Sequence, residues 1–443
     1  MHSLDSQPSS SGRMVEVKMN WEKMRAKPAA ILGRGISGRG LENLLKRLNW
    51  NSWTFDEKGV PFSQSKLNDS SVVLSSPGFS PNHPWIRMTQ ESNVPLYGEM
   101  DFASSFIGND SLAVTGTNGK TTLSYLLAHV MKHLGEKSVL VGNMGYPLSQ
   151  YLADTISTNE RLVLEVSSFQ TGNLQILEPA YSFWTNFEDD HLDYHESRRK
   201  YFLSKMRLLE RTRETSWVGE SVRYGARKLK IQLSPSVRVV HRRPSRNFPL
   251  SEGHFLSSFP QRENYSIAEA YFRTRGVSPE EFAELVEDFV PQPFRLRQIA
   301  QIQETSFWND SKATNLSATL AACRSMKGRT IWIGGGKSKG TQVDQFAIGM
   351  KDYLDQAFVI GEVSDELYSS FTHNGIPVSR CRSLPEAVEG AYLASKSKTN
   401  VLFSPGFASF DQFQNYEDRG NLFNQVVFDL KKKTRMSTQV ESN

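Results

Sequence analysis

The chain contains only two cysteines, Cys323 and Cys381, among 443 residues. They have neither a metal-binding nor a redox spacing, so we expect two ordinary thiols in a reducing cytoplasm. No segment approaches the roughly 18 to 20 uninterrupted apolar residues that a membrane span needs. The first residues, MHSLDSQPSSSGR, lack the apolar core of a secretory signal. These absences exclude a disulfide scaffold, and they predict a cytoplasmic protein without a membrane span.

The chain also lacks a large excess of charge of one sign. Its net charge is +5, with 22% charged residues, which suits small anionic substrates but is no footprint of nucleic-acid binding. The densest basic run, residues 227–246, alternates with apolar residues and predicts a solvated surface hairpin. We therefore expect small-molecule partners and no nucleic acid, and we expect the protein to be a monomer.

Three blocks of alternating strand-like and helix-like segments follow one another along the chain. Short β-rich apolar runs end in glycine or small polar residues, a pattern typical of a parallel α/β fold. At about 150 residues per domain, the length suits two to three domains. The two prolines in residues 290–297 indicate a linker into the last block. We expect a disordered extension over residues 1–27 and domains over residues 28–108, 109–293 and 294–443.

Residues 113–122 read AVTGTNGKTT and match half of the phosphate-binding loop G-x-x-x-x-G-K-[ST]. Val114 stands where the first glycine is expected, but Gly119, Lys120 and Thr121 keep the half that contacts phosphate. An apolar strand precedes this segment and a helical pattern follows it. Free backbone N–H groups at the helix start and the charge of Lys120 attract an anion, and Thr121 is placed to ligate Mg²⁺. The segment predicts a nucleotide-phosphate site.

Residues 33–38, GRGISG, follow the strand-like AAIL and match G-x-G-x-x-G. Asp56 and Glu57 come about 20 residues later, at the end of another strand, as in a Rossmann-like nucleotide site. The pattern leaves the nucleotide open, so a nicotinamide-dependent oxidoreductase remains an alternative. A phosphate-loop switch or binding ATPase, which hydrolyses nucleotide without an amino acid, is another.

Further polar groups stand at or just past the ends of predicted strands. Glu165 ends the apolar run LVLE and is placed as a second anchor for Mg²⁺. The segment TNFEDDHLDYH carries His191 and Asp193 among acidic residues, which suits a divalent cation. WNDSKATN, residues 308–315, and GGGKSKG, residues 334–340, are candidate ligand loops. Because parallel sheets bind ligands at the carboxyl edge of their strands, we expect these groups to form sites there.

Taken together and in this order, TGTNGKTT, LEVSSFQ, TNFEDDHLDYH and NDSKATN resemble the ATP and metal motifs of the Mur ligase family. The resemblance covers about residues 28–430. It implies an α/β protein of three domains: a Rossmann-like N-terminal domain that binds a UDP substrate, a P-loop-type ATP-binding central domain, and a Rossmann-like C-terminal domain that binds an amino acid.

Within this family, SPGFASFDQFQNYEDRGNLF, residues 404–423, resembles the C-terminal signature of the D-glutamate-adding branch. The resemblance implies ATP-dependent joining of D-glutamate to UDP-N-acetylmuramoyl-L-alanine (UDP-MurNAc-L-Ala). The reaction would pass through an acyl phosphate, give ADP and phosphate, and serve peptidoglycan precursor synthesis.

The resemblance also implies the role of individual residues in binding ATP and metal. It makes Lys120, His191 and Lys205 catalytic. It implies two Mg²⁺ ions, held by Thr121, Glu165, His191 and Lys205, with Lys205 carbamylated. The ATP-binding positions are Gly116, Thr117, Asn118, Gly119, Lys120, Thr121, Thr122, Asn264, Arg295 and Asp310.

The same resemblance implies the substrate-binding residues. Those for the UDP substrate are Ile36, Ser37, Asp56, Ser76, Pro77 and Gly78, with Asn143 for the muramoyl part. Those of the C-terminal domain are Lys312, Thr314, Lys337, Ser409 and Tyr416. Family members often have Asp-Gly-Lys where this chain has Gly335-Gly336-Lys337, so both Lys337 and Lys339 are candidates for the glutamate side-chain carboxylate. The base that deprotonates the amine of D-glutamate is not identified by the sequence.

Overall fold

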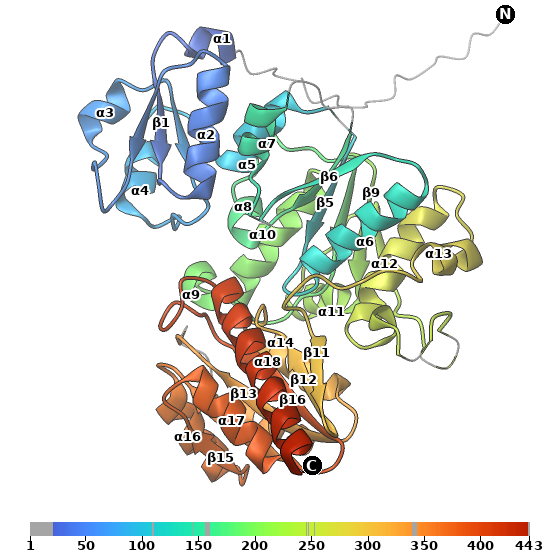
Figure 1. Ribbon diagram of the computed structural model, residues 1–443. Helices are drawn as coiled ribbons and strands as arrows, with labels where there is room; N and C mark the ends of the chain where they lie inside the picture. The colour runs from blue at the N-terminus through green and yellow to red at the C-terminus, as the bar shows by residue number, and fades with distance from the viewer. Residues whose placement is uncertain are drawn as a thin grey trace, which may run out of the picture. The chain divides into compact units, whose positions relative to one another are not determined.

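The computed structural model of the protein describes residues 21–441, except residues 109, 144, 156–159, 245, 247, 252 and 339–342 (Figure 1). The side chains of Asp193 and of residues 436–441 are not described either. The chain divides into two compact units, one up to Glu99 and one from Met100 onward. Within the described residues, no helix has the length and apolar character required to cross a membrane.

The first unit is a parallel sheet with helices on both faces. Its elements are α1 (Trp21–Met24), β1 (Ala29–Leu32), α2 (Ile36–Arg47), β2 (Ser52–Phe55), α3 (Gln64–Asn68), β3 (Val72–Ser75), α4 (Pro84–Gln90) and β4 (Leu96–Gly98). The strands lie in the order β2-β1-β3-β4. Ala30 and Leu32 pack with Leu67 of α3 and Ile86 of α4. Since side chains alternate along a strand, the neighbouring apolar residues of β1 serve the other face, which α2 covers.

The first described residues differ from the predicted extension over 1–27. Residues up to 20 lie outside the described part of the chain, but Trp21 begins α1. Its side chain is buried and lies edge-on to Tyr97, with ring centroids 5.6 Å apart, and beside Trp50 at 6.1 Å. The burial of this large apolar side chain orders the chain before residue 28.

The second unit contains two six-stranded sheets. The first of them packs against the helix that follows the phosphate loop. Its elements are α5 (Glu99–Ala103), η1 (Ser104–Phe106), β5 (Ser111–Thr115), α6 (Lys120–His133), β6 (Ser138–Gly142), α7 (Leu148–Asp154), β7 (Arg161–Glu165), α8 (Ser168–Thr171), β8 (Tyr181–Trp184), α9 (Leu192–His195), α10 (Arg198–Glu210), β9 (Thr215–Gly219), α11 (Glu220–Lys228), β10 (Val237–Val240), η3 (Phe255–Ser257), α12 (Gln261–Arg273) and α13 (Pro279–Leu285). All strands are parallel, in the order β10-β9-β8-β5-β7-β6. Helices α6, α12 and α13 share one core with Leu112 and Val114 of β5 (Figure 1).

The second sheet of this unit is parallel except at one edge. Its elements are β11 (Arg297–Ile302), β12 (Thr305–Asn309), α14 (Leu316–Ser325), β13 (Arg329–Gly335), α15 (Val343–Met350), η4 (Lys351–Tyr353), β14 (Gln356–Ile360), α16 (Ser364–His373), β15 (Val378–Arg380), α17 (Leu384–Ala394), β16 (Thr399–Gly406) and α18 (Tyr416–Glu441). The order is β11-β12-β16-β13-β14-β15, with β11 antiparallel to β12. Helices α17 and α18 cover one face, and α14, α15 and α16 cover the other.

The predicted α/β class with parallel sheets is confirmed, and the two thiols are free, Cys323 buried and Cys381 half-buried. The hairpin predicted over residues 227–246 is wrong. The run instead contains the end of α11 and strand β10, and β10 pairs parallel with β9. The alternating apolar residues form a strand at the edge of the sheet. This strand is parallel to β9 because the preceding helix provides the crossover connection.

The boundary between the two compact units, at Glu99, lies earlier in the chain than the domain boundary predicted at residue 108. The carboxylate of Asp101 explains the difference, since it accepts hydrogen bonds from the backbone N–H groups of Gln175 (2.9 Å), Ile176 (2.8 Å) and Leu177 (2.9 Å). Asp101 is only 2% exposed. Helix α5 is thereby fixed to the turn before β8. The three-domain boundaries themselves stay a prediction.

Replacement of Asp101 by alanine tests this fixed point. The change leaves three backbone N–H groups without their acceptor, so we expect the free energy of unfolding to fall by about 3 kcal/mol. Denaturant unfolding followed by circular dichroism measures it. Glu178→Ala, in the same segment as Leu177, is the matched control, because its half-exposed carboxylate forms a surface ion pair with Arg211. Its loss should cost less than about 1 kcal/mol. Equal losses in the two variants would contradict the assigned role.

Candidate active site

The phosphate loop joins β5 to α6 through two glycines in conformations that other residues avoid. Gly116 has φ +150°, and a Cβ placed there would lie 1.9 Å from Oγ1 of Thr185. Gly119 has φ +81° and forms the N-cap of α6. Lys120 is the first residue of the helix, and its Nζ donates to the carbonyl oxygens of Gly116 (3.0 Å) and Thr117 (2.9 Å). The loop therefore turns tightly around the lysine ammonium.

The neighbouring strand end holds the loop in this form. The backbone N–H of Asn118 donates to Oδ1 of Asn186 at 2.8 Å, and its side-chain amide donates to Glu188 at 3.1 Å. Thr117 Oγ1 lies 3.2 Å from the Tyr201 hydroxyl. These polar side chains come from the segment after β8 and from α10, so the tertiary fold prepares the loop in advance.

Asn264 and Thr122 also take up positions at this loop. The amide of Asn264 would lie 2.9 Å from a Cβ on Gly119, which places this predicted ATP-binding residue against the loop. Thr122 is buried in the first turn of α6. The structure thus brings together the predicted ATP-binding residues of the central sheet.

Thr121 and Glu165 form a pair of oxygen donors beside the loop. Thr121 Oγ1 donates to Oε2 of Glu165 at 2.5 Å, and the Asn143 amide donates to Oε1 at 3.0 Å. Mg²⁺ prefers oxygen ligands, and this hydroxyl and carboxylate offer two neighbouring oxygen donors. Asn143, predicted to contact the muramoyl part, orients the carboxylate.

Lys205 lies under the phosphate loop with only 1% of its surface exposed. Its Nζ donates to the carbonyl oxygen of Gly116 at 2.8 Å and lies 4.9 Å from the centre of the Tyr201 ring. Burial, together with the nearby charge of Lys120, lowers the pKa of Lys205 well below its ordinary value. Burial also lowers the pKa of Lys120. Lys205 is therefore not a solvated helix lysine.

His191 lies at the N-cap of the short helix α9 in a left-handed conformation, with φ 52°. Its ring packs edge-on against Phe169, at 4.7 Å between centroids, and its Nε2 lies 3.5 Å from Asp190 Oδ2. Burial lowers the pKa of both Lys120 and Lys205, and Asp190 lies close enough to offset part of that effect. The imidazole thus lies beside an anion that belongs to the lysine cluster.

The loop after β12 forms the C-terminal part of the site. Asp310 accepts from Ser404 Oγ at 2.7 Å and from the backbone N–H of Leu296 at 3.0 Å. Burial raises the pKa of this carboxyl to about 7. The ammonium of Lys312 lies 3.5 Å over the Tyr416 ring, and burial lowers the pKa of Lys312 to about 8. Asp310 is therefore tied to its own sheet, whereas Lys312 is held against an aromatic face.

Asn315 connects this loop to the phosphate loop. Its Nδ2 donates to Oδ1 of Asn118 at 3.1 Å and to Oδ2 of Asp190 at 3.1 Å. Arg295 lies close enough to lower the pKa of Lys120 and of Lys312. Positive groups from both sheets therefore gather at one place, as the binding of a polyphosphate requires.

The remaining C-terminal candidates lie on two adjoining loops. The backbone N–H of Lys337 donates to the carbonyl of Ala408 at 2.8 Å, which brings Lys337 beside Ser409. Ser409 is buried, Thr314 is half-buried and the side chain of Lys337 is exposed. Lys339 lies outside the described residues, so the choice between the two lysines stays open.

In the first unit, the residues predicted for the UDP substrate gather at the carboxyl edge of the sheet. Asp56 accepts from the backbone N–H of Arg34 (3.1 Å) and of Lys58 (3.1 Å), and these bonds, that of Arg34 first, lower its pKa. A Cβ on Gly33 would lie 2.9 Å from Ser76 Oγ. The other members begin α2 or follow β3: Ile36, Ser37, Pro77 and Gly78.

Arg419 is a site residue that the sequence analysis did not single out. It is 1% exposed, and its guanidinium donates to Ser311 O (2.9 Å), Ser311 Oγ (3.2 Å) and the carbonyl of Phe407 (3.1 Å). It thereby fixes the loop of Lys312 to the loop of Ser409. Its place within EDRGN gave no signal, because an arginine in a charged helix start is ordinarily solvated.

The Mur ligase middle domain matches residues 114–231. The UDP-N-acetylmuramoylalanine–D-glutamate ligase of Aquifex aeolicus is 30% identical over 416 residues, 90% of this chain and 97% of the relative. The ligase of that name from Christiangramia forsetii is 28% identical, over 91% of this chain and all of the relative.

Among solved structures, the UDP-N-acetylmuramate–alanine ligase MurC of Thermotoga maritima covers 91% of this chain and 99% of its own, with a TM-score of 0.56 and 17% identity. That likeness supports the fold. The chain has the phosphate loop, matches the middle-domain model, and is 30% identical to a relative over nearly the full length of that relative. It therefore belongs to the Mur ligase family. Within this family, both sequence relatives are named as D-glutamate ligases.

The lowered pKa of Lys205 predicts how stability depends on pH. In the folded chain Lys205 gives up its proton more easily than in the unfolded chain, so below about pH 10.5 it costs stability. Lys205→Met should therefore stabilise the protein in buffer freed of carbon dioxide. At neutral pH we expect the free energy of unfolding of the variant to exceed that of the wild type, because the buried positive charge is then gone.

Thermal unfolding of Lys205→Met at several pH values measures this gain, which should shrink as the pH approaches 10.5. Lys200→Met on the same helix is the control, because its side chain is 63% exposed and should show little change. A gain of the same size at all pH values would mean that packing, not charge, is responsible.

Proposed function

We propose that the protein joins D-glutamate to UDP-MurNAc-L-Ala and converts ATP to ADP and phosphate, a step of peptidoglycan precursor synthesis. The proposal is supported by relatives that carry this activity in their names and match over almost their whole length. Within the structure, the proposal rests on the side-chain amide of Asn315. It donates one hydrogen bond to Asn118 of the phosphate loop and one to Asp190. This link supports the proposal because it joins the phosphate loop to the loop that, in the proposal, binds an anionic amino acid.

The chemistry explains why such a site is needed. A carboxylate is a poor electrophile, and D-glutamate brings further negative charge to ATP. Transfer of the γ-phosphoryl group to an oxygen of the alanine carboxylate releases ADP and gives an acyl phosphate. The amine of D-glutamate attacks the acyl carbon and loses a proton, and phosphate leaves with the former carboxylate oxygen. Positioning and charge neutralisation supply most of the catalysis of phosphoryl transfer.

The residues of the chain supply these effects. Lys120 stands at the N-terminus of α6, where free N–H groups and its own charge bind phosphate oxygens. Arg295 adds a positive charge from the segment before β11. In the proposal, Lys312, Thr314, Ser409, Tyr416 and Lys337 hold D-glutamate. Ile36, Ser37, Asp56 and residues 76–78 hold the UDP part.

Two Mg²⁺ ions form part of the proposal. Thr121 and Glu165 fit one ion, since both offer oxygen atoms 2.5 Å apart. We place the second with His191 and Lys205. Bound there, the ions would offset negative charge on the phosphates and on the reacting carboxylate.

Carbamylation of Lys205 would supply the oxygen ligands that an amine lacks. Carbon dioxide reacts with a neutral amine, and burial with the nearby Lys120 favours that form of Lys205. The product is an anionic carbamate that would offset the charge of Lys120.

A monomeric state and a cytoplasmic location also remain predictions.

Phosphate release with ATP, Mg²⁺, UDP-MurNAc-L-Ala and a panel of amino acids tests the proposed reaction. We expect release to require both UDP-MurNAc-L-Ala and D-glutamate. Lys120→Ala should abolish it while leaving the circular dichroism spectrum unchanged, and Lys200→Ala serves as the exposed control. Release that depends on another amino acid would overturn the substrate, and release that needs no amino acid would indicate a simple ATPase.

The carbamate has its own test. Lys205→Ala should lose at least about 100-fold in turnover, within the range of a lost charged catalytic group. Added short-chain carboxylates should restore part of the loss by offering the missing oxygen atoms. Lys120→Ala should gain nothing from them. Mass spectrometry of the intact wild-type protein, together with a failure of rescue, decides against the carbamate if Lys205 is found unmodified.

A further inference from the structure

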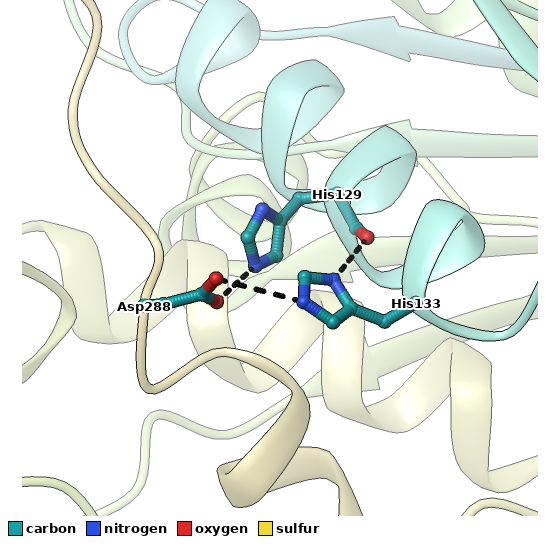
Figure 2. Close-up of side chains that lie close together, drawn as sticks. All are labelled: His129, His133 and Asp288. Carbon is teal, nitrogen blue, oxygen red and sulfur yellow. Dashed lines mark hydrogen bonds and ion pairs between the residues drawn. The ribbon is translucent and has the colours of Figure 1, made fainter.

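A second group of metal-ligating side chains lies at the far end of α6 from the phosphate loop. His129 and His133 are four residues apart and therefore share one face of the helix. Figure 2 shows both rings turned toward the carboxylate of Asp288, which lies in the segment between α13 and β11. At 1.5 Å per residue, His133 lies about 20 Å along the helix from Lys120, so the group is separate from the active site.

The ligand atoms of these side chains already converge. One from each residue lies within 4.8 Å of the other two. His129 Nε2 is 3.0 Å from Asp288 Oδ1, and His133 Nε2 is 3.6 Å from Oδ2 (Figure 2). Zn–N and Zn–O bonds of about 2.0–2.1 Å place tetrahedral ligands roughly 3.3 Å apart. Side-chain rotations that also move His129 Nε2 away from the carbonyl oxygen of Leu285, now 3.1 Å from it, would surround one ion.

A backbone contact prepares one imidazole for coordination. His133 Nδ1 lies 3.0 Å from the carbonyl oxygen of His129, to which it can only donate. The proton of the neutral ring is then on Nδ1, which leaves Nε2, the nitrogen that faces Asp288, as its ligand atom. Metal-ligating histidines are commonly oriented in this way, with the second ring nitrogen bonded to a backbone carbonyl.

The carboxylate lies between two packed residues, although its side chain is 70% exposed. Val286 and Phe289, on either side of it, are buried in the core shared with α6. The Phe289 ring packs edge-on against His129 at 5.3 Å between centroids. The three ligands are thus positioned by packing, and not by a loose surface loop.

Open coordination positions face a groove. His129 and Asp288 line a pocket of about 770 Å³ together with Lys132, Glu136, Val139 and Val290. Solvent can therefore complete the coordination of an ion held by three protein ligands.

We propose that His129, His133 and Asp288 bind one transition-metal ion of the Zn²⁺ type, outside the Mg²⁺ chemistry of the active site. Two imidazoles and one carboxylate suit Zn²⁺, Co²⁺ or Ni²⁺, whereas Mg²⁺ prefers oxygen ligands. The ion joins the C-terminal end of α6 to the segment that leads into β11. It therefore restrains residues 286–293.

Titration of the metal-free full-length protein with Zn²⁺ in a large excess of Mg²⁺ tests the site. We expect one tight equivalent by calorimetry, and Co²⁺ should give the visible spectrum of a site with nitrogen ligands. His133→Ala and Asp288→Asn should each weaken binding at least about tenfold, and His129→Ala/His133→Ala should abolish the equivalent. Circular dichroism checks that each variant is folded.

Two matched variants decide where the ion binds. His373→Ala, at the end of α16, should keep the full affinity, as should His191→Ala in the active site. If His129→Ala/His133→Ala binds like the wild type, or if His191→Ala removes the equivalent, the proposal is wrong. If the wild type binds no Zn²⁺ under these conditions, the three residues form an ion-pair cluster only.

Hydrogen exchange provides a readout that does not depend on activity. Zn²⁺ should slow exchange in a peptide covering residues 286–293 of the wild type and leave it unchanged in Asp288→Asn. Equal slowing in both proteins would contradict the restraint of this segment by the ion.

Discussion

The carbonyl oxygen of Gly116 accepts a hydrogen bond from each of two lysines, Lys120 at 3.0 Å and Lys205 at 2.8 Å. Burial penalises the charge of both lysines, and the charge of Lys120 adds to the effect on Lys205. The pKa of each lysine is therefore lowered. In the proposed function, an anion that binds at the loop offsets the positive charge that the fold buries here.

The rest of the site depends on the fixed shape of this loop. Gly116 and Gly119 adopt conformations that bring the helix start close to Thr185 and Asn264. With the loop fixed, Thr121 meets the carboxylate of Glu165, which strand β7 delivers at its carboxyl end. The second sheet then joins through Asn315. In the proposed function, a site built from two sheets in this way brings ATP and an amino acid together only when both loops are in position.

Helix α6 has a different role at each of its ends. Its first turn binds the phosphate loop, its buried face packs in the central core, and its last turn carries two histidines beside Asp288. Because the helix is rigid and tightly packed, an ion at its far end restrains the segment toward β11 without touching the reacting groups. The proposed ion thus acts on the segment between α13 and β11 from one end of α6, whereas the phosphate loop lies at the other end.

The sequence by itself determined the parallel α/β class, the strand and helix around Lys120, and the polar groups at strand ends, because period, glycine spacing and capping are local properties. It did not determine that Lys205 is buried, that Arg419 joins two loops, or that Trp21 is part of the first unit. Each of these depends on partners far away in the chain: Gly116, Ser311 and Tyr97. The prediction of a hairpin over residues 227–246 was wrong for the same reason. The alternation of apolar and polar residues along one segment cannot specify which strand lies next to it. Only the tertiary structure decided burial and pairing, because both are set by residues distant in sequence.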